Sequence, residues 1–163
     1  EELFGDRTFQ FGGAALAGLA LKPHQKFRLG VYASGEFFGL FIIPLLGVDW
    51  RIDDHNYLFG VLPGRLTFEH QWNDRLFGGA TFRAPTTSYR FADGSFIRLD
   101  DNQISAFVDY YISKQFCVTV EPGYGLLRRI RTGVNTEEYL TKVQWGDGFF
   151  LKVSGAYRIR FGE

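Results

Sequence analysis

The stretch from Phe149 to Phe161 constrains the fold of this chain most strongly. Every second residue from Phe149 is apolar or glycine, whereas the positions between them carry the charges of Lys152, Arg158 and Arg160. A period of two is that of a β-strand with one apolar and one polar face. Sustained over thirteen residues, it is typical of a transmembrane β-strand, in which lipid-facing and lumen-facing side chains alternate across the bilayer.

Eight upstream segments show a related alternation or end at turn residues, and each is predicted to be a strand. These segments are 8–22, 26–34, 46–52, 57–62, 65–72, 75–84, 102–112 and 115–127. Eighteen Phe, eight Tyr and twenty Gly in 163 residues agree with one domain of β-strands joined by tight turns. The longest apolar run, 37–47, contains Pro44 and is far shorter than the roughly 20 residues that a membrane helix needs.

The predicted connections differ in length at the two ends of the strands. Those at 23–25, 53–56, 73–74 and 113–114 are short, and those at 35–43, 85–101 and 128–148 are long. Outer-membrane barrels show this difference, with short turns in the periplasm and longer loops outside. Within the second long connection, Asp93-Gly94 is a hairpin signal that could extend both neighbouring strands beyond the membrane. We therefore expect extracellular loops and periplasmic turns, with the C-terminus on the periplasmic side.

Aromatic residues recur beside the short turns, and the sequence ends with another aromatic at the same level. Amphipathic rings prefer the headgroup layer of a membrane, so these residues predict an interfacial girdle. The predicted girdle consists of Phe27, Trp50, Tyr57, Trp72, Tyr110, Phe116 and Phe161.

The predicted strand number is nine, which is odd. Bacterial single-chain barrels have even numbers of strands, and an open edge in lipid would leave backbone groups without hydrogen bonds. The fold class is therefore predicted to be an all-β, antiparallel up-and-down transmembrane barrel of about 8–12 strands. We expect the single domain 1–163 to be processed or incomplete at the N-terminus, unless the short segment 57–62 is misassigned.

Charged side chains share the face of the strands opposite the apolar one. An arginine at the lipid-facing midplane costs roughly 2–4 kcal/mol, so this register predicts that the charges face the lumen. They are Arg28, Asp49, Arg51, Arg65, Glu69, Arg83, Asp109, Glu121, Lys152, Arg158 and Arg160. Two interpretations stay open: the charges interlock as ion pairs and plug a narrow barrel, or they line a water-filled pore with a small positive excess.

Three arginines follow the predicted strand 115–127 at its loop end, namely Arg128, Arg129 and Arg131. The guanidinium group suits phosphate recognition, so the cluster predicts a contact with lipopolysaccharide phosphates. A solvated loop is the alternative interpretation.

Several short motifs carry a family resemblance. They are Phe37-Phe38-Gly39, Ile43-Pro44-Leu45-Leu46-Gly47-Val48-Asp49-Trp50, Leu62-Pro63-Gly64, Ser88-Tyr89-Arg90 and Tyr157-Arg158-Ile159-Arg160-Phe161. They resemble a family of predicted outer-membrane β-barrel proteins of unknown function, common in the Bacteroidota. The resemblance covers most of the chain from about Lys26 and implies an outer-membrane location and a barrel fold, but no reaction and no catalytic residue. Family members are longer at the N-terminus, which agrees with a missing strand.

No cofactor, metal or catalytic residue is predicted. The single Cys117 excludes an internal disulfide and is interpreted as a small filler residue. No pair among the three histidines has metal-ligand spacing. The 18 basic and 18 acidic residues balance, so nucleic acid is not an expected partner. The expected partners are outer-membrane lipids and lipopolysaccharide, with other outer-membrane proteins as a further option.

The sequence thus predicts an outer-membrane β-barrel that acts as a passive, porin-like pore or as a structural subunit of an outer-membrane assembly, and not as an enzyme. Two alternatives stay open. A soluble, lipocalin-like ligand-binding barrel would have an apolar interior and a charged exterior. An outer-membrane lipid-modifying enzyme would need a constellation around a residue such as His70 or Asp109.

Overall fold

The chain forms one antiparallel β-sheet over the residues that the computed structural model describes, which are 10–36, 39–134, 138–144 and 146–157. The strands are β1 (Phe11–Lys22), β2 (Gln25–Glu36), β3 (Gly39–Arg51), β4 (Asn56–Leu62), β5 (Arg65–Asn73), β6 (Leu76–Arg83), β7 (Thr86–Arg90), β8 (Ser95–Tyr111), β9 (Phe116–Val134), β10 (Glu138–Gln144) and β11 (Gly148–Tyr157). The predicted all-β, antiparallel, up-and-down fold is confirmed, and no helix in these residues is long and apolar enough to cross a membrane.

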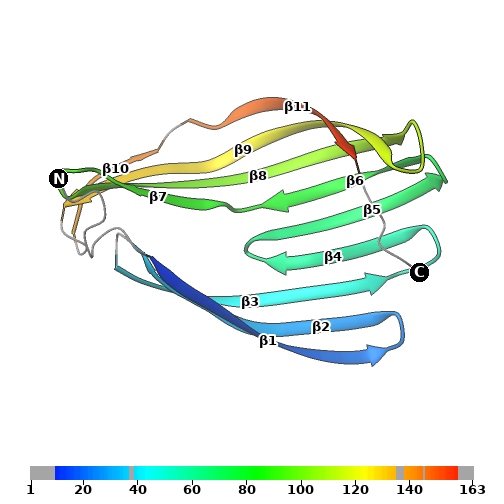
Figure 1. The fold of residues 1–163 in the computed structure, drawn as a ribbon, viewed down its shortest axis with the longest axis horizontal. Coiled ribbons are helices and arrows are strands. Elements are labelled where there is room, and N and C mark those ends of the chain that lie inside the picture. Colours follow the sequence, from blue (N-terminus) through cyan, green and yellow to red (C-terminus); the bar gives the residue numbers. More distant parts are fainter. Residues whose placement is uncertain (1–9, 37–38, 135–137, 145, 158–163) are drawn as a thin grey trace.

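The eleven strands make nine antiparallel passes along the sheet, which is the predicted number (Figure 1). β6 and β7 are two parts of one pass beside β8, interrupted at Ala84-Pro85, because proline cannot donate a ladder hydrogen bond. β10 and β11 pair with different parts of β9. Among the described residues the outermost passes, β1 and β10–β11, do not pair with each other, so the sheet is not closed there.

The two faces of the sheet differ in chemistry. Residues opposite each other in neighbouring strands share a face. Lys26 lies opposite Asp49, Asp49 opposite Phe59, Phe59 opposite Thr67, and Thr67 opposite Thr81. We call the side that carries these residues the polar face. The other side, the apolar face, carries exposed large side chains. They include Leu29, Val31, Leu46, Phe68, Ile104, Val108, Val120, Leu151 and Val153.

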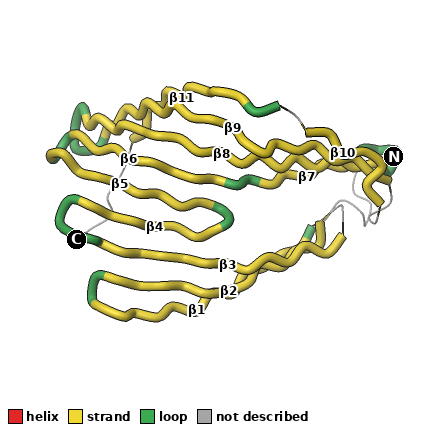
Figure 2. The backbone as a smooth tube through the Cα atoms, turned by 180° about the vertical axis from the view of Figure 1, so that it is seen from behind, coloured by secondary structure: helices red, strands yellow, loops and turns green. Residues whose placement is uncertain are grey.

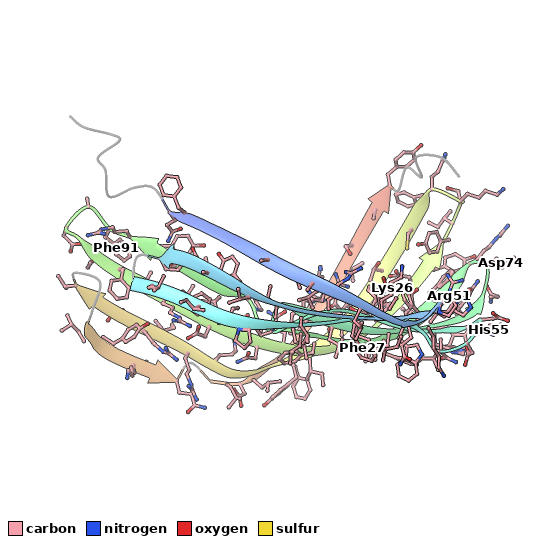
Figure 3. The ribbon with its side chains drawn as sticks, turned by 90° about the horizontal axis from the view of Figure 1, so that it is seen from below. Lys26, Phe27, Arg51, His55, Asp74 and Phe91 are labelled. Atoms are coloured by element: carbon pink, nitrogen blue, oxygen red, sulfur yellow. The ribbon has the colours of Figure 1, made fainter. Side chains whose placement is uncertain are left out.

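The polar face is concave. Glu36 of β2 accepts a 2.9 Å hydrogen bond from Ser88 of β7, although β3 lies between these passes at this level, and β4 and β5 also separate them nearer the short turns. The Arg98 guanidinium of β8 lies 5.1 Å from the centre of the Phe41 ring of β3. Such contacts require the sheet to bend toward its polar side, and Figure 3 shows the curved sheet from below, with Phe91 at one end and Arg51, His55 and Asp74 near the other.

The sheet has almost no apolar core. Among the described residues, the buried apolar side chains are those of Phe96, Phe107 and Cys117. Cys117 is fully buried, as expected for a filler residue. The large apolar side chains lie on the convex face and are exposed, and in the part of the chain that the structure describes the sheet has no second layer (Figure 2).

The prediction of long loops at one end is wrong, because most residues of these stretches belong to strands. β2 extends to Glu36 and β3 begins at Gly39, β7 and β8 occupy most of 85–101, and β9 continues to Val134. The polar residues in these stretches hid the strand pattern, because their backbones pair with a neighbouring strand regardless of side-chain polarity. The Asp93-Gly94 hairpin between β7 and β8 is confirmed, with a φ of 84° at Gly94, and so are the short turns at the opposite end.

Candidate functional site

An ion-pair network occupies the middle of the polar face. Glu121 of β9 is 4% exposed, and its carboxylate forms an ion pair with Arg83 of β6. Its Oε2 lies 3.7 Å from Lys152 Nζ of β11, and its Oε1 accepts a 2.7 Å hydrogen bond from Ser105 of β8. A buried carboxylate requires such compensation, because its desolvation is costly. Glu121 therefore ties four passes of the sheet together.

Further polar contacts continue this network along the sheet. The hydroxyls of Thr67 and Thr81 are 3.0 Å apart and buried, and Arg65 Nε donates to Thr67 at 3.1 Å. Asp109, also buried, accepts a 2.5 Å hydrogen bond from Thr119. The Thr67–Thr81 and Asp109–Thr119 contacts join adjacent strands along the concave wall, whereas the Arg65–Thr67 contact lies within β5.

The predicted lumen-lining charges that fall in the described residues share one face. The register places all nine of them on the polar face: Arg28, Asp49, Arg51, Arg65, Glu69, Arg83, Asp109, Glu121 and Lys152. Arg158 and Arg160 lie outside the described residues. Near the short turns, Arg28 Nη2 lies 3.3 Å from Asp49 Oδ2. Lining of a lumen by these residues stays a prediction.

Five residues of the predicted aromatic girdle share one face of the sheet, and their place at a membrane interface stays a prediction. Phe27, Trp50, Trp72, Tyr110 and Phe116 lie on the apolar face near the short turns. Phe161 lies outside the described residues.

The prediction that Tyr57 belongs to this girdle is wrong. Its position opposite Arg51 places it on the polar face, where its hydroxyl donates a 2.8 Å hydrogen bond to Asp49. The short β4 segment has apolar residues on both faces, so its alternation did not reveal which way Tyr57 points.

The predicted arginine cluster does not lie in a loop. Arg128, Arg129 and Arg131 belong to β9, and the first pairs with Asp101 of β8 at 2.9 Å. The β8–β9 register shifts at this level, and Leu127 has a φ of 52°. Such a bulge redirects side chains. Arg129 and Arg131 consequently line a cavity in the concave side, and their contact with lipopolysaccharide stays a prediction.

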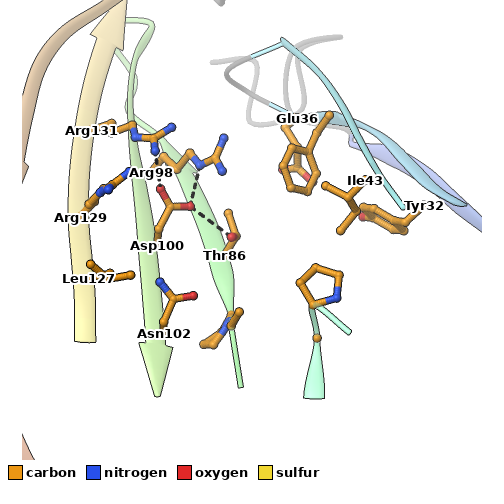
Figure 4. A pocket seen from close by; sticks show the side chains of 15 residues that line it. Tyr32, Glu36, Ile43, Thr86, Arg98, Asp100, Asn102, Leu127, Arg129 and Arg131 are labelled. Carbon is orange, nitrogen blue, oxygen red and sulfur yellow. Dashed lines mark hydrogen bonds and ion pairs between the residues drawn. The ribbon is translucent and has the colours of Figure 1, made fainter. Parts of the chain in front are cut away.

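This cavity has a volume of about 600 Å³ and two chemically different walls. β2 and β3 contribute Tyr32, Phe41 and Ile43 together with Glu36, whereas β8 and β9 contribute arginines around Asp100 (Figure 4). Sequence reasoning missed most of this site, because the residues 35–43 and 85–101 were interpreted as connections. The spacing of Arg98 and Asp100, two residues apart, was the one sign in the sequence that both side chains lie on the same face of a strand.

Asp100 organises the cationic wall. Its Oδ1 accepts a hydrogen bond from Arg98 Nε at 2.9 Å, and its Oδ2 lies 3.4 Å from Arg131 Nη2. Arg98 also donates to the Tyr139 hydroxyl at 3.3 Å. The exposed Arg129 guanidinium makes no hydrogen bond or ion pair among the described residues, so it remains available to a ligand.

The described residues contain no group of three side chains that could hold a metal ion. His70 lies on the apolar face, with Nδ1 2.8 Å from Asn56 Oδ1, whereas Asp109 lies on the polar face. These two residues, which the lipid-modifying alternative would use, are therefore not brought together.

The comparisons with known proteins give no match: no family model, curated protein or solved structure is recognisably similar to this chain. The resemblance to the Bacteroidota family therefore stays a prediction, and the function must be argued from the geometry.

Proposed function

We propose that the chain forms the wall of a bacterial outer-membrane β-barrel with a polar lumen and acts as a passive pore. The observation that carries this proposal is the uncovered apolar face on the convex side of the sheet. On β11 alone, Phe149, Leu151 and Val153 are 91%, 68% and 65% exposed. Leaving such side chains in water forgoes about 1.5–3 kcal/mol each, whereas a bilayer would cover them.

The strand lengths also fit a membrane. A transmembrane β-strand needs about 9–11 residues, and β1, β2 and β3 have 12, 12 and 13. The aromatic residues near the short turns lie where the interface would be, and Trp72 and Tyr110 are 52% and 47% exposed there. These features support an orientation with the short turns in the periplasm.

A soluble ligand-binding barrel needs the opposite arrangement, with an apolar concave face and a polar convex face. Here the concave face carries Glu121, Arg83 and their partners, and the convex face is apolar. Covering the apolar face would require lipid or another large apolar partner. The geometry therefore favours a membrane wall over a soluble carrier.

A pore is favoured over a plugged lumen by the direction of the ion pairs. Glu121–Lys152, Arg28–Asp49 and Arg131–Asp100 join adjacent strands along the wall, and Arg83–Glu121 spans one further strand, β8. Of the nine described charges assigned to the lumen, Arg28, Arg51, Arg65, Arg83 and Lys152 are positive and Asp49, Glu69, Asp109 and Glu121 are negative. Five positive against four negative charges predict a mild anion preference.

The test is single-channel conductance in a planar bilayer, with the ion selectivity obtained from the reversal potential. We expect stable open steps and mild anion preference, and the double variant Arg51→Gln and Arg65→Gln should shift selectivity toward cations. Insertion without conductance would replace the pore with a structural role in the membrane. Failure of the protein to float with lipid vesicles would contradict the membrane proposal itself.

A further inference from the structure

The β4–β5 hairpin is too short to span the sheet. β4 has 7 residues, fewer than the 9–11 or so that cross a bilayer. It pairs with β3 from Arg51 only to Leu46, and β5 pairs with β6 only to Arg83. Beyond the turn at Pro63-Gly64, no strand in the described part of the chain stands between β3 and β7 (Figures 1 and 2). The wall therefore has an opening in the half away from the short turns.

The opening is bounded on all four sides. The Pro63-Gly64 turn borders it on the side of the short turns, and we call this its lower border. β3 and β7 form its two flanks. Its upper border, on the side away from the short turns, is formed by hydrogen bonds to the Glu36 carboxylate. Ser88 donates to this carboxylate at 2.9 Å, and Gln10 Nε2 donates to it at 2.8 Å. We call this opening the β3–β7 window.

The cavity described above shares residues with the border of the window. Pro63 and Gly64 of the lower border line it, as do Glu36 at the upper border and Thr86 of β7. Its volume of about 600 Å³ falls within the roughly 300–1,000 Å³ of sites that bind one small ligand. Figure 4 shows Tyr32 and Ile43 on one side and Arg98, Asp100 and Arg131 on the other.

The two walls suit the two ends of an amphiphile. One wall has an apolar surface made by Tyr32, Phe41 and Ile43. The rings of Tyr32 and Phe41 pack edge to face, with 6.3 Å between their centres. On the opposite wall, three arginines face one aspartate, and Arg129 is the arginine left without an ion pair among the described residues. A guanidinium binds a carboxylate or phosphate with two parallel hydrogen bonds.

We propose that the β3–β7 window admits a single-chain anionic amphiphile from the outer leaflet, of which a long-chain fatty acid is the simplest example. Its anionic head binds Arg129 and Arg131, and its hydrocarbon chain lies along Tyr32, Phe41 and Ile43. The inference rests on the proposed function, because the window opens onto lipid only if the sheet spans the membrane. It goes beyond a passive pore by assigning a binding site and a lateral route.

The test measures palmitate binding to the whole protein in nanodiscs, by displacement of a fluorescent fatty acid. Arg129→Gln should weaken binding about tenfold or more, because a charge-assisted hydrogen bond is lost. Arg129 is exposed, so this change should not affect folding. Arg51→Gln is the matched control: it removes an exposed arginine from the same face, near the short turns and outside the cavity, and should leave palmitate affinity unchanged.

Two further measurements separate the parts of the proposal. The methyl ester of palmitate should bind about tenfold more weakly than palmitate, and Ile43→Trp should reduce palmitate binding by filling the apolar wall. Equal affinity of the ester and the acid, or of Arg129→Gln and the unmodified protein, would overturn the site. If the protein floats with vesicles but binds no palmitate, the window proposal fails while the membrane proposal stands.

Discussion

Ser88 of β7 donates a 2.9 Å hydrogen bond to Glu36 of β2 across the concave side of the sheet. Nearer the short turns, where β4 and β5 lie between them, the two passes are four strand spacings apart, which is roughly 19 Å in a flat sheet. The contact therefore shows that the two passes converge on the polar side of the sheet, and it shows which face lies inside. Because polar-face residues meet in this way, the apolar face is the convex one.

Two leucines at a similar level test this assignment of faces. Leu29 of β2 lies on the apolar face and is 63% exposed, whereas Leu16 of β1 lies on the polar face and is 47% exposed. If the apolar face contacts lipid, Leu29→Arg should lower the free energy of unfolding in vesicles by about 2–4 kcal/mol. Leu16→Arg should change it by less than about 0.5 kcal/mol.

The measurement is urea unfolding of both variants in lipid vesicles, followed by tryptophan fluorescence. An equal loss of stability in the two variants would contradict the assignment of lipid to the convex side.

The alternation that makes this comparison possible was readable from the sequence. Leu29 and Val31 alternate with Arg28 and Tyr32, and the convex and concave sides of β2 follow from a period of two. Closure of the sheet was not readable in the same way, because closure depends on pairing between strands far apart in the chain. Local alternation carries no information about such pairing.

The buried carboxylate of Glu121 should be the most sensitive charge of the polar face. Glu121→Ala would leave Arg83 and Lys152 without their shared partner. Breaking a buried ion pair costs about 3–5 kcal/mol, and we expect about 3 kcal/mol here because Lys152 keeps partial contact with solvent. The loss should appear as a lower urea midpoint in the vesicle unfolding experiment.

The pair Arg28–Asp49 provides the control, since its side chains are 44% and 33% exposed. Arg28→Gln should cost only about 0–1 kcal/mol. The double variant Glu121→Leu and Arg83→Leu should recover much of the loss, because apolar pairs can replace buried ion pairs. Equal effects of Glu121→Ala and Arg28→Gln would show that burial does not govern these charges.

Gly60 should be required for the short β4–β5 hairpin. Its φ is +137°, and an added Cβ would lie 2.2 Å from the Arg65 carbonyl oxygen. Gly60→Ala combines backbone strain of about 1–3 kcal/mol with this clash, so we expect a loss of at least about 2 kcal/mol. Hydrogen exchange should show the loss first at the amides of the hairpin.

Gly13 is the matched control, because a Cβ there would meet no atom within 4 Å. Gly13→Ala should leave stability unchanged or raise it by about 0.4–1 kcal/mol. A Gly60→Ala variant as stable as Gly13→Ala would mean that the hairpin relaxes without cost.

The cavity shows where sequence reasoning reached its limit. Arg129 and Arg131 attracted notice as a cationic cluster, but their polarity suggested a loop, and the wall opposite them was hidden in another predicted loop at 35–43. The bulge at Leu127 depends on how β9 pairs with β8, so the direction of Arg129 follows from the pairing and not from the local sequence. The proximity of Phe41 to Arg98 likewise depends on the curvature of the whole sheet.

The turn between β3 and β4 predicts a pH dependence at a carboxylate outside the strands. The Asn56 side-chain amide donates to the Asp53 carboxylate at 2.7 and 2.9 Å, and the backbone N–H groups of His55 and Asn56 each donate to it at 2.8 Å. These hydrogen bonds, led by that of the Asn56 side chain, hold the pKa of Asp53 below the ordinary value of an aspartate.

Because the pKa of Asp53 is lower in the folded turn than in the unfolded chain, the ionised carboxylate stabilises the turn above the unfolded pKa. This stabilisation is lost as the pH falls through the folded pKa. NMR titration of the side-chain carboxyl should therefore give an Asp53 midpoint below that of an unfolded peptide, and Asn56→Ala should move it upward. The pKa of Asp93, which hydrogen bonds from Ser95 lower in a different turn, should not change in this variant. An Asp53 midpoint that Asn56→Ala leaves in place would show that the Asn56 amide does not hold the carboxylate in solution.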